Sequence, residues 1–484
     1  MQSFEGKQCT EIFAAGTVKH VSQPQHVHFV GIGGYGMSAI ARVMLDLGYE
    51  VSGSDVSTPE LATRLKERGA RVYLGHAPSQ VAGADVVVYS TAVPADNVEL
   101  KAARDQHIPV IHRSEMLSRL MADRTGIAIA GAHGKTTTTS MIAYVMERCG
   151  LDPTFVIGGV VNNIGDNAKA GAGQFVVAEA DESDGSFLHY RPQIAVVTAI
   201  EADHLEYYDG SFENLKAAYA QFIRQIPAGG LCVMSAEDSH IRSLRNEAAA
   251  RICTFGIEQE ADYMAKQVQL LDRGSLSVVY YRGQRLGELA LSVPGRHNIM
   301  NALAAIAVTL EAGLSFEQVT AELATFHGAK RRFQVISEAS DVLVIDDYAH
   351  HPTEITATIA AARTTGRRII AVFQPQRYTR TYFLFDAFAR AFQGADEVII
   401  TDIYSPPGER QIEGVTAERL VEQIRLHSNP NVRFLRSKDN VYDYLLATVN
   451  AGDLVLTMGA GDIWQVAVRL GTVLQERTEE EATM

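Results

Sequence analysis

A short glycine-rich loop lies between an apolar run and a helix-like stretch near residue 130. The run Gly126-Ile-Ala-Ile-Ala is typical of a strand, residues 131–137 read Gly-Ala-His-Gly-Lys-Thr-Thr, and Thr138–Arg148 has the composition of a helix. When a strand turns directly into a helix, the loop N–H groups and the positive end of the helix dipole converge on one point, which favours an anion. This order predicts a parallel α/β sheet with an anion site at its edge.

The residues of the loop specify which anion it binds. Lys135 adds a point charge for phosphate, and Thr136 offers a hydroxyl to magnesium. Gly131 and Gly134 enclose two residues, whereas the common P-loop has four between its glycines, so a tighter loop is expected. A chance Gly-Lys-Thr is the alternative. We predict an ATP site whose loop residues are Gly131, Ala132, His133, Gly134, Lys135, Thr136 and Thr137.

Composition limits the class of protein. The 484 residues exceed one ordinary domain, and 46% hydrophobic with 21% charged residues is typical of a soluble globular chain. A net charge of −14 disfavours nonspecific binding to nucleic acid, and no stretch is apolar enough for a membrane span. Glu5, Lys7 and Glu11 argue against a signal peptide. A cytoplasmic protein is expected, as a monomer or a weak homodimer.

The four cysteines show no C-x-x-C spacing, so neither a disulfide framework nor a zinc knuckle is predicted.

Apolar strands alternate with amphipathic helices in three successive segments, which predicts parallel sheets with helical crossovers. The expected domains are 1–122, 123–328 and 329–484, with a β-rich part near Tyr263–Leu291. Glu476–Met484 is expected to be a solvated tail. The expected strands include His26–Val30, Glu50–Gly53, Asp85–Tyr89, Phe175–Ala178, Ile194–Thr198, Leu231–Met234, Asp341–Ile345, Arg368–Phe373, Glu397–Ile400 and Leu454–Leu456.

A second glycine motif follows the first expected strand. Gly31-Ile-Gly-Gly-Tyr-Gly36 precedes an expected helix, Ser38–Leu47, and Asp55 lies nineteen residues after Gly36. These positions match the dinucleotide-binding fingerprint, in which glycines admit a diphosphate and the acid binds a ribose hydroxyl. An NAD-dependent dehydrogenase and a purely structural turn are the alternatives. Because hydride transfer has no need of the separate ATP loop, we favour a substrate that carries a diphosphate.

Acidic residues follow two strands of the middle segment. Phe175–Ala178 runs into Glu179-Ala-Asp-Glu-Ser-Asp184, and Ile194–Thr198 precedes Glu201-Ala-Asp-His204. Both strand ends are expected beside the phosphate loop, where carboxylates hold the magnesium that accompanies ATP. The alternative is that these acids cap the following helices. By residue chemistry alone His204 is more typical of a hydrogen-bonding group, since magnesium prefers oxygen.

Together these motifs closely resemble the Mur ligases of bacterial cell-wall synthesis, nearly end to end. The resemblance implies ATP-dependent amide formation and three domains: a Rossmann-like UDP-binding domain, a P-loop ATPase-like central domain and a Rossmann-like C-terminal domain. It is strongest with the branch that joins L-alanine to UDP-N-acetylmuramate through an acyl phosphate. The motifs are Gly31–Met37, Gly131–Thr137, Ala178–Asp184, Pro294–Asn298 with Asn301–Leu303, Asp346–Pro352 and Phe373–Arg380.

The resemblance also assigns roles to residues. It implies contacts to the UDP-sugar from Gly31, Gly33, Gly34, Gly36, Met37 and Asp55. It implies magnesium ligands Thr136, Glu179 and His204, nucleotide contacts Asn298, Arg332, Asp347 and Tyr348, and amino-acid contacts His350, Arg377 and Arg380. The catalytic set would be Lys135, Glu179, His204, Arg332 and His350, the last as the candidate base for the amine. Taken alone, Asn298 reads as the cap of a helix Ile299–Leu310.

Three further expectations follow from the resemblance. Relatives commonly have His where this chain has Gln376, so a contact from that imidazole is not expected here. Lys216 is not assigned as the carbamylated lysine of some Mur ligases. Closure of the third domain over the second would hinge near Gly328–Arg332. The rivals are a family member that recycles a preformed tripeptide and a noncatalytic nucleotide-binding regulator.

Overall fold

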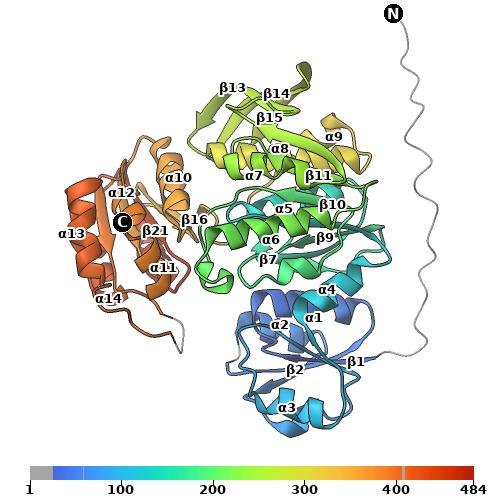
Figure 1. Ribbon diagram of the computed structural model, residues 1–484. Coiled ribbons are helices and arrows are strands. Elements are labelled where there is room, and N and C mark those ends of the chain that lie inside the picture. The colour runs from blue at the N-terminus through green and yellow to red at the C-terminus, as the bar shows by residue number, and fades with distance from the viewer. Residues whose placement is uncertain (1–24, 58, 406–408, 484) are drawn as a thin grey trace, which may run out of the picture. The chain divides into compact units, whose positions relative to one another are not determined.

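The computed structural model describes residues 25–57, 59–405 and 409–483. The expectations about a signal peptide and Cys9 lie outside these ranges. The chain divides into two compact units, Met1–Gly126 and Ile127–Met484, and each is an α/β structure (Figure 1). Three sheets are present, one in the first unit and two in the second, so the predicted α/β class with three domains is confirmed.

The first unit contains a five-stranded parallel sheet in the order β3-β2-β1-β4-β5. Its central strand β1 buries all five residues, as expected where helices cover both faces. Helices α1 and α2 cover one face and α3 the other (Figure 1). The strands are β1 (His26–Val30), β2 (Glu50–Asp55), β3 (Arg71–Leu74), β4 (Val86–Tyr89) and β5 (Val110–His112). The helices are α1 (Tyr35–Asp46), α2 (Glu60–Glu67), η1 (Pro78–Val81), α3 (Val98–Asp105) and α4 (Arg113–Met121).

Helix α1 begins at Tyr35, three residues before the expected start at Ser38. Gly34 is its N-cap, so Gly36 and Met37 lie in the first helical turn and the connecting loop is confined to Gly31–Gly34. Glycine has a low helix propensity, so Gly34 and Gly36 made the true start hard to see in the sequence. The earlier start brings the positive end of α1 directly against the glycine loop.

The carboxylate of Glu99 is fully buried in the first unit and satisfied by hydrogen bonds. Its Oε2 pairs with His28 Nε2 at 2.7 Å and accepts from Ser54 Oγ at 2.8 Å. Its Oε1 lies 3.0 Å from His76 Nδ1 and accepts from the Ala77 N–H at 3.2 Å. This network ties α3 to the two central strands and to the segment after β3.

The second unit begins with a ten-stranded mixed sheet, β15-β14-β13-β12-β11-β10-β6-β9-β7-β8. Strands β13 to β15 form an antiparallel meander and confirm the predicted β-rich part. The strands are β6 (Thr125–Ala130), β7 (Thr154–Val161), β8 (Asp166–Lys169), β9 (Phe175–Glu179), β10 (Ile194–Val197), β11 (Leu231–Ser235), β12 (Arg251–Gly256), β13 (Tyr263–Leu271), β14 (Gly274–Tyr281) and β15 (Gln284–Leu291). The helices are α5 (Lys135–Arg148), η2 (Ser186–His189), η3 (Leu205–Tyr208), α6 (Phe212–Arg224), α7 (Ser239–Ser243), η4 (Arg245–Glu247), α8 (Arg296–Glu311) and α9 (Phe316–Leu323).

Strand β6 lies between β9 and β10, and this order positions the predicted site. The phosphate loop follows β6, Glu179 ends β9, and the segment with Glu201 and His204 follows β10. Both acidic strand ends therefore flank the loop, as predicted. Helices α5 and α8 pack on each other and on the sheet, in a core that includes Met141, Phe155 and Leu303.

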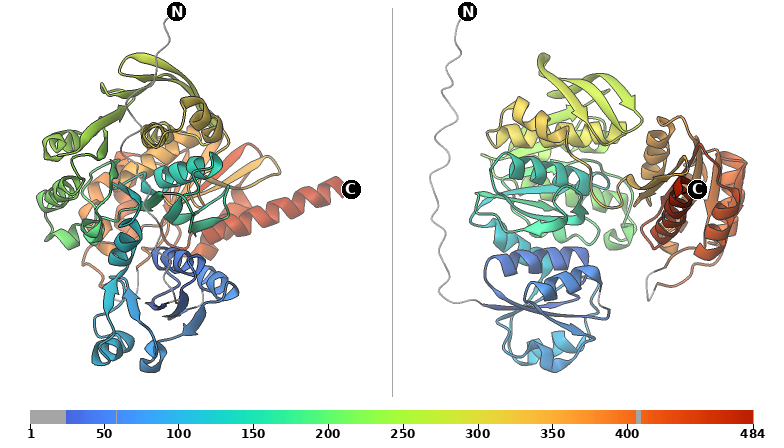
Figure 2. Two further views of the ribbon diagram at one scale, coloured as in Figure 1. Left: turned by 90° about the vertical axis from the view of Figure 1, so that its right-hand side faces the viewer. Right: turned by 180° about the vertical axis from the view of Figure 1, so that it is seen from behind.

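The C-terminal sheet has six strands in the order β16-β17-β21-β18-β19-β20, all parallel except β16. Apolar residues line both faces: one core includes Ile345, Ile359 and Phe388, and the other includes Val344, Val441 and Leu470. Helices α10, α12 and α13 cover the first face, and α14 and α15 the second (Figure 2). The strands are β16 (Gln334–Ala339), β17 (Val342–Asp347), β18 (Arg368–Phe373), β19 (Glu397–Ile400), β20 (Val432–Phe434) and β21 (Asp453–Met458). The helices are α10 (Pro352–Arg363), α11 (Tyr378–Phe383), α12 (Phe385–Arg390), α13 (Ala417–His427), α14 (Lys438–Thr448) and α15 (Trp464–Thr483).

The segment that joins the two sheets of the second unit is fixed at its start. The Asn162 N–H donates to Gly328 O at 3.0 Å, and the Lys330 N–H donates to Val160 O at 2.8 Å, which attaches this segment to the end of β7. Positive φ values follow, at Arg331 (61°) and Phe333 (49°). Left-handed backbone conformations therefore lie on both sides of Lys330, since Gly328 has a φ of 77°.

The expected solvated tail at Glu476–Met484 is exposed over residues 476–480, and it is helical. Helix α15 continues to Thr483, and its residues from Gln475 to Glu480 are exposed. Charged residues with good helix propensity prolong the helix after its apolar face has ended. Within the described ranges, no helix combines the length and apolar composition that crossing a membrane requires.

We expect Glu99→Ala to destabilise the first unit by about 3–5 kcal/mol, because it removes one partner of a buried charged network and leaves the others unsatisfied. The free energy of unfolding, measured by denaturant titration of the full chain, tests this. Glu115→Ala is the matched control, since Glu115 pairs with Arg119 on an exposed surface and is expected to change stability by at most about 0.5 kcal/mol. Equal effects of the two substitutions would contradict a structural role for the network.

Candidate active site

The phosphate loop has a shape that only glycine fits at two positions. Gly131 has φ +139°, and a Cβ there would lie 2.1 Å from Thr198 Oγ1. Gly134 has φ +81°, and a Cβ there would lie 2.5 Å from the Asn301 side-chain oxygen. Gly134 is the N-cap of α5, which starts at Lys135, three residues before the expected helix. Lys135 and Thr136 therefore lie in the first turn, where backbone N–H groups favour an anion.

The ammonium group of Lys135 is held by its own loop and by a carboxylate. Nζ donates to Gly131 O at 2.5 Å and to both oxygens of Glu182 at 2.8 Å. Burial alone would lower the pKa of Lys135, but the negative charges of Glu182 and Asp181 raise it above its usual value. Lys135 is therefore a fixed positive charge at the loop.

Thr136 and Glu179 supply neighbouring oxygen atoms beside the loop. Thr136 Oγ1 donates to Glu179 Oε2 at 3.3 Å, and Glu179 Oε1 accepts from the Gly158 N–H at 2.6 Å. Burial raises the pKa of Glu179, although the Gly158 N–H and Lys135 act in the opposite direction. A desolvated carboxylate beside a hydroxyl is the donor chemistry that suits a hard cation such as magnesium.

His204 lies on the other side of the loop, with φ +53°, at the start of η3. Its Nε2 is 3.6 Å from Asp203 Oδ2 and its Nδ1 is 3.9 Å from Glu206 Oε1. Among the described residues, Glu179 and His204 share no hydrogen bond or ion pair. The structure thus places the three predicted magnesium ligands around the loop but joins only Thr136 and Glu179.

Arg380, an expected amino-acid contact, is buried and fully engaged. Its Nε and Nη2 donate to the two oxygens of Asp203 at 3.1 and 3.2 Å, and its Nη1 donates to Gln376 Oε1 at 2.9 Å. Although burial raises the pKa of Asp203, Arg380 and His204 hold it well below its usual range. Gln376 therefore orients Arg380 through an acceptor oxygen. Arg377 is more exposed, and its Nη1 lies 3.3 Å from Glu206 Oε1.

Glu354, in the first turn of α10, collects several cationic or polar groups. Its Oε1 is 3.2 Å from His133 Nδ1 and 3.7 Å from Arg332 Nη1, and its Oε2 accepts from the His350 N–H at 2.9 Å. Glu354 also completes the capping box of α10 with His351. Despite burial, which raises it, His350 and His133 hold the pKa of Glu354 well below its usual value.

Burial disfavours the charged form of His350. Burial lowers its pKa to about 3, and its Nδ1 lies 2.9 Å from Tyr348 O. A general base works best when its pKa lies near the working pH. This geometry favours a hydrogen-bonding role for His350 over the role of base for the amine.

The predicted nucleotide contacts after β17 are only partly available to a ligand. Asp347 accepts from the Phe333 N–H at 2.6 Å and the Ala349 N–H at 2.7 Å, and burial raises its pKa to about 6. It therefore shapes the loop. The guanidinium groups of Arg331 and Arg332 lie over the Tyr348 ring, at 5.0 and 5.2 Å from its centroid. Arg331 pairs with Asp346 at 2.9 Å, whereas Arg332 lies 3.7 Å from its ion-pair partner Glu354.

A cavity of about 800 Å³ adjoins these groups, and His133, Thr137, Asn298, Arg332 and Asp347 are part of its lining. Asn298 is not the cap of a helix that starts at Ile299, so that reading was wrong. Helix α8 starts at Arg296 with Gly295 as N-cap, and Asn298 Nδ2 donates back to Pro294 O at 2.7 Å. Arg296 and His297 lack the apolar pattern that would have indicated the earlier start.

The N-terminal glycine loop is internally bonded. The N–H groups of Gly31 and Ile32 donate to Ser54 O at 2.8 and 3.0 Å, and the Gly33 N–H donates to Asp55 Oδ2 at 2.9 Å. A Cβ on Gly33 would lie 2.3 Å from Pro59, whereas a Cβ on Gly36 would lie 3.3 Å from an Arg113 guanidinium nitrogen. Asp55 thus stabilises the glycine loop by accepting a hydrogen bond from the Gly33 N–H. The positive charge of this site comes from the N-terminus of α1 and from the neighbouring Arg113 guanidinium.

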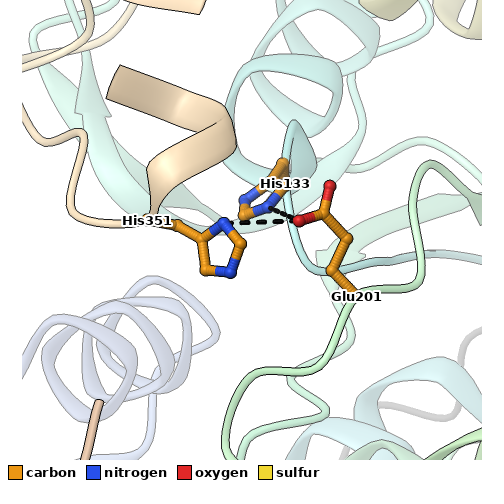
Figure 3. Close-up of side chains that lie close together, drawn as sticks. All are labelled: His133, Glu201 and His351. Atoms are coloured by element: carbon orange, nitrogen blue, oxygen red, sulfur yellow. Dashed lines mark ion pairs between the residues drawn. The ribbon is translucent and has the colours of Figure 1, made fainter. Parts of the chain in front are cut away.

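His133 links the phosphate loop to two carboxylates. Its Nε2 is 3.4 Å from Glu201 Oε2, and its Nδ1 faces Glu354 (Figure 3). Burial lowers the pKa of His133, but Glu201 and Glu354 together raise it to about 10. His351, also in Figure 3, places its Nδ1 3.3 Å from the same Glu201 oxygen.

Sequence reasoning missed three of these partners, Glu182, Asp203 and Glu354. The first two stand inside acidic stretches that had been singled out without a role for each residue. Glu354 could have been noticed as the third residue of a helix that starts at Pro352, which is a capping position. None of the three could be paired with its partner from spacing, since Asp203 lies 177 residues from Arg380.

Comparison with known sequences agrees with this arrangement. Family sequence models match residues 26–125 (Mur ligase family, catalytic domain), 129–309 (Mur ligase middle domain) and 331–461 (Mur ligase, glutamate ligase domain). Curated relatives are about 50% identical to this chain over more than 90% of its length. This chain belongs to the Mur ligase family.

Two relatives and two solved structures illustrate the family match. The UDP-N-acetylmuramate–L-alanine ligases of Symbiobacterium thermophilum and Geotalea daltonii are 49% and 50% identical, covering 93% of this chain and 95% and 98% of theirs. The UDP-N-acetylmuramate-alanine ligase of Thermotoga maritima matches with a TM-score of 0.79 and 30% identity, covering 94% and 99%. A murein peptide ligase from Psychrobacter arcticus matches with a TM-score of 0.69 and 26% identity, covering 93% and 98%.

We expect the stabilising effect of Glu201 to depend on pH. The folded-state pKa of His133 is raised from 6.5 to about 10, so its contribution is complete below pH 6.5 and is lost as pH rises toward about 10. The difference in unfolding free energy between wild type and Glu201→Gln should therefore shrink over this window. Glu213→Gln, at an exposed ion pair with Lys216, is the control and should show no such trend. A constant difference for Glu201→Gln would contradict a charged His133.

Proposed function

We infer that this chain joins L-alanine to UDP-N-acetylmuramate and converts ATP to ADP and phosphate, in peptidoglycan synthesis. The family match and the names of relatives at 49–50% identity carry this conclusion. A phosphate loop with Lys135 in the first turn of α5 agrees with an ATP-dependent reaction. The murein peptide ligase alternative has the weaker support, because its solved structures match with TM-scores of 0.69 and 0.59, against 0.79 for the alanine ligase.

The proposed reaction has two steps. A carboxylate oxygen of the sugar nucleotide attacks the γ-phosphorus of ATP, and the bond to the β-phosphate oxygen breaks. ADP departs, and the sugar nucleotide becomes an acyl phosphate. The amine of alanine then attacks the acyl carbon, phosphate leaves, and the nitrogen loses a proton to give the amide. The first step brings negative charges together, and the amides of Gly131–Thr137 with Lys135 stabilise them as fixed donors.

Lys135 must change partner when ATP binds. Its contacts with Glu182 and Gly131 O occupy the position at which a phosphate oxygen is expected. Glu182 therefore keeps the ammonium charged and oriented in the absence of nucleotide. We further propose that Arg332, beside Glu354, reaches the γ-phosphate, and that Asn298 contacts adenine from the cavity wall.

Magnesium fits the residues proposed to hold it. Thr136 Oγ1 and Glu179 Oε2 lie 3.3 Å apart and provide the oxygen donors for one ion, and His204 is proposed to bind a second magnesium ion. When bound, the ion would neutralise charge on the β- and γ-phosphates. Arg377 is proposed to bind the α-carboxylate of alanine, for which a guanidinium fork is suited. Arg380 would join it only by exchanging its contacts with Asp203 for the substrate carboxylate. His350 would position the amine by a hydrogen bond.

The remaining assignments are also proposals. The UDP-sugar would bind at the start of α1, near Gly31, Gly33, Gly34, Gly36, Met37 and Asp55. Domain boundaries near residues 122 and 328 are supported by the positions of the family matches and by the loop between α9 and β16. We place the enzyme in the cytoplasm, as a monomer or weak homodimer that binds no nucleic acid.

We expect Lys135→Ala to lower kcat by at least about 10²–10³-fold, roughly 3–4 kcal/mol, because a fixed charge in the phosphate loop is lost. Phosphate release in the presence of both substrates measures it. Lys216→Ala removes an ammonium that forms an ion pair with the exposed Glu213, and it should keep wild-type activity. Normal ATP turnover by Lys135→Ala would refute the ATP site.

Phosphate release should require UDP-N-acetylmuramate and an amino acid together. With L-alanine, glycine and L-serine compared, kcat/KM should be highest for L-alanine, by about 10-fold or more over glycine, since one methyl group in a pocket is worth about 1–3 kcal/mol. Release without any amino acid would instead indicate a regulator or a bare ATPase. Preference for a tripeptide would indicate the peptide-recycling branch.

A further inference from the structure

Three side chains from distant parts of the second unit converge beside the ATP cavity. His133 comes from the phosphate loop, Glu201 from the segment after β10, and His351 from the N-cap of α10. One ligand atom from each lies within 4.8 Å of the others. Figure 3 shows that both imidazole rings direct a nitrogen at the same Glu201 carboxylate oxygen. None of the three is among the proposed magnesium ligands.

The spacing within this cluster is that of metal ligands more than of hydrogen-bonded partners. Glu201 Oε2 lies 3.4 Å from His133 Nε2 and 3.3 Å from His351 Nδ1. Charge-assisted N–H···O bonds are about 2.7–2.9 Å long. In a tetrahedral zinc site with bonds of about 2.0–2.1 Å, neighbouring ligand atoms are roughly 3.3 Å apart.

The imidazole nitrogens are also unsatisfied. Within the described part of the chain, both ring nitrogens of His133 and Nε2 of His351 are buried without a hydrogen-bond partner. His351 is only 4% exposed, and its Nδ1 has one long contact of 3.4 Å from the Thr353 N–H. Buried polar atoms are normally paired, so unpaired nitrogens beside a carboxylate indicate a missing ligand.

The surroundings match the outer shell of a metal site. A metal-bound histidine commonly directs its other nitrogen at a carboxylate, which fixes the ring. His133 does so, with Nδ1 3.2 Å from Glu354 Oε1. Thr353 Oγ1 donates to Glu201 Oε2 at 2.8 Å and orients the carboxylate. A metal ion would take the place of the proton on His133, and the two neighbouring carboxylates, Glu201 and Glu354, favour a cation there.

We propose that His133 Nε2, Glu201 Oε2 and His351 Nδ1 form a binding site for one divalent transition-metal ion, with zinc as the best fit. Two nitrogen donors and one oxygen donor suit zinc and disfavour magnesium, which selects oxygen. The fourth position is open to water. One bound ion joins the phosphate loop to the start of α10 and so fixes the two sheets of the second unit to each other.

The test uses the full chain, stripped of metal with a chelator and then titrated with Zn²⁺ against a chromophoric competitor. We expect one equivalent to bind with a dissociation constant of roughly 1 µM or tighter, and Co²⁺ to give the visible absorption of a tetrahedral site. Zinc should raise the thermal unfolding midpoint. Millimolar Mg²⁺ should not displace it.

His351→Asn is the main variant, because asparagine preserves an N-cap for α10 and removes the imidazole. Zinc affinity should fall at least about tenfold, and the zinc-induced rise of the midpoint should disappear. Glu201→Gln keeps an acceptor for Thr353 and should weaken zinc similarly, so it carries the test if His351→Asn does not fold. His240→Asn changes a histidine that lines the same cavity outside the cluster, and should bind zinc like wild type.

Three outcomes would overturn the site. The first is no zinc binding by the metal-free wild-type chain. The second is unchanged affinity in both His351→Asn and Glu201→Gln. The third is thiolate-to-cobalt charge-transfer absorption, which would place the ion at the free cysteines Cys149, Cys232 or Cys253.

Discussion

The order of three strands, β9-β6-β10, is the constraint on which the candidate site depends. Because β6 runs parallel to β10 and ends in the phosphate loop, the residues after β10 arrive beside that loop. Glu179 reaches it from the opposite neighbour. Carboxylates from both sides then surround Lys135 and His133. Burial lowers the pKa of both groups, but the negative charges of these carboxylates raise it above its usual value. The chemistry of the site is therefore a product of sheet topology.

Most of the fold could be predicted from local patterns. Arg368–Phe373 and Glu397–Ile400 are strands over the expected residues, because buried parallel strands are continuous apolar runs with clear limits. Helix starts were less well predicted. Helices α1, α5 and α8 all begin earlier than expected, because glycine and polar residues fill their first turns while the apolar pattern begins later.

The candidate site divides in the same way. Motif residues such as Lys135, Thr136 and Glu179 could be selected because their spacing follows a strand and a helix. Their partners could not, since the pairs Arg380–Asp203 and His133–Glu354 depend on how the C-terminal sheet meets the central one. Asp55 illustrates a further limit: its position in a fingerprint was recognisable, but its hydrogen bond to the Gly33 N–H depends on local loop geometry.

The attachment of Gly328 and Lys330 to the end of β7 has a consequence for Arg332. These backbone hydrogen bonds make the chain before Arg331 part of the ten-stranded sheet, so a rotation of the C-terminal sheet has its axis near Arg331. Arg332 is one residue from that axis and has a short lever arm. Its guanidinium would stay near the phosphate loop through a swing that displaces Arg377 and Arg380 much further. The nucleotide contact proposed for Arg332 would thus persist while the proposed amino-acid side opens and exchanges its contents.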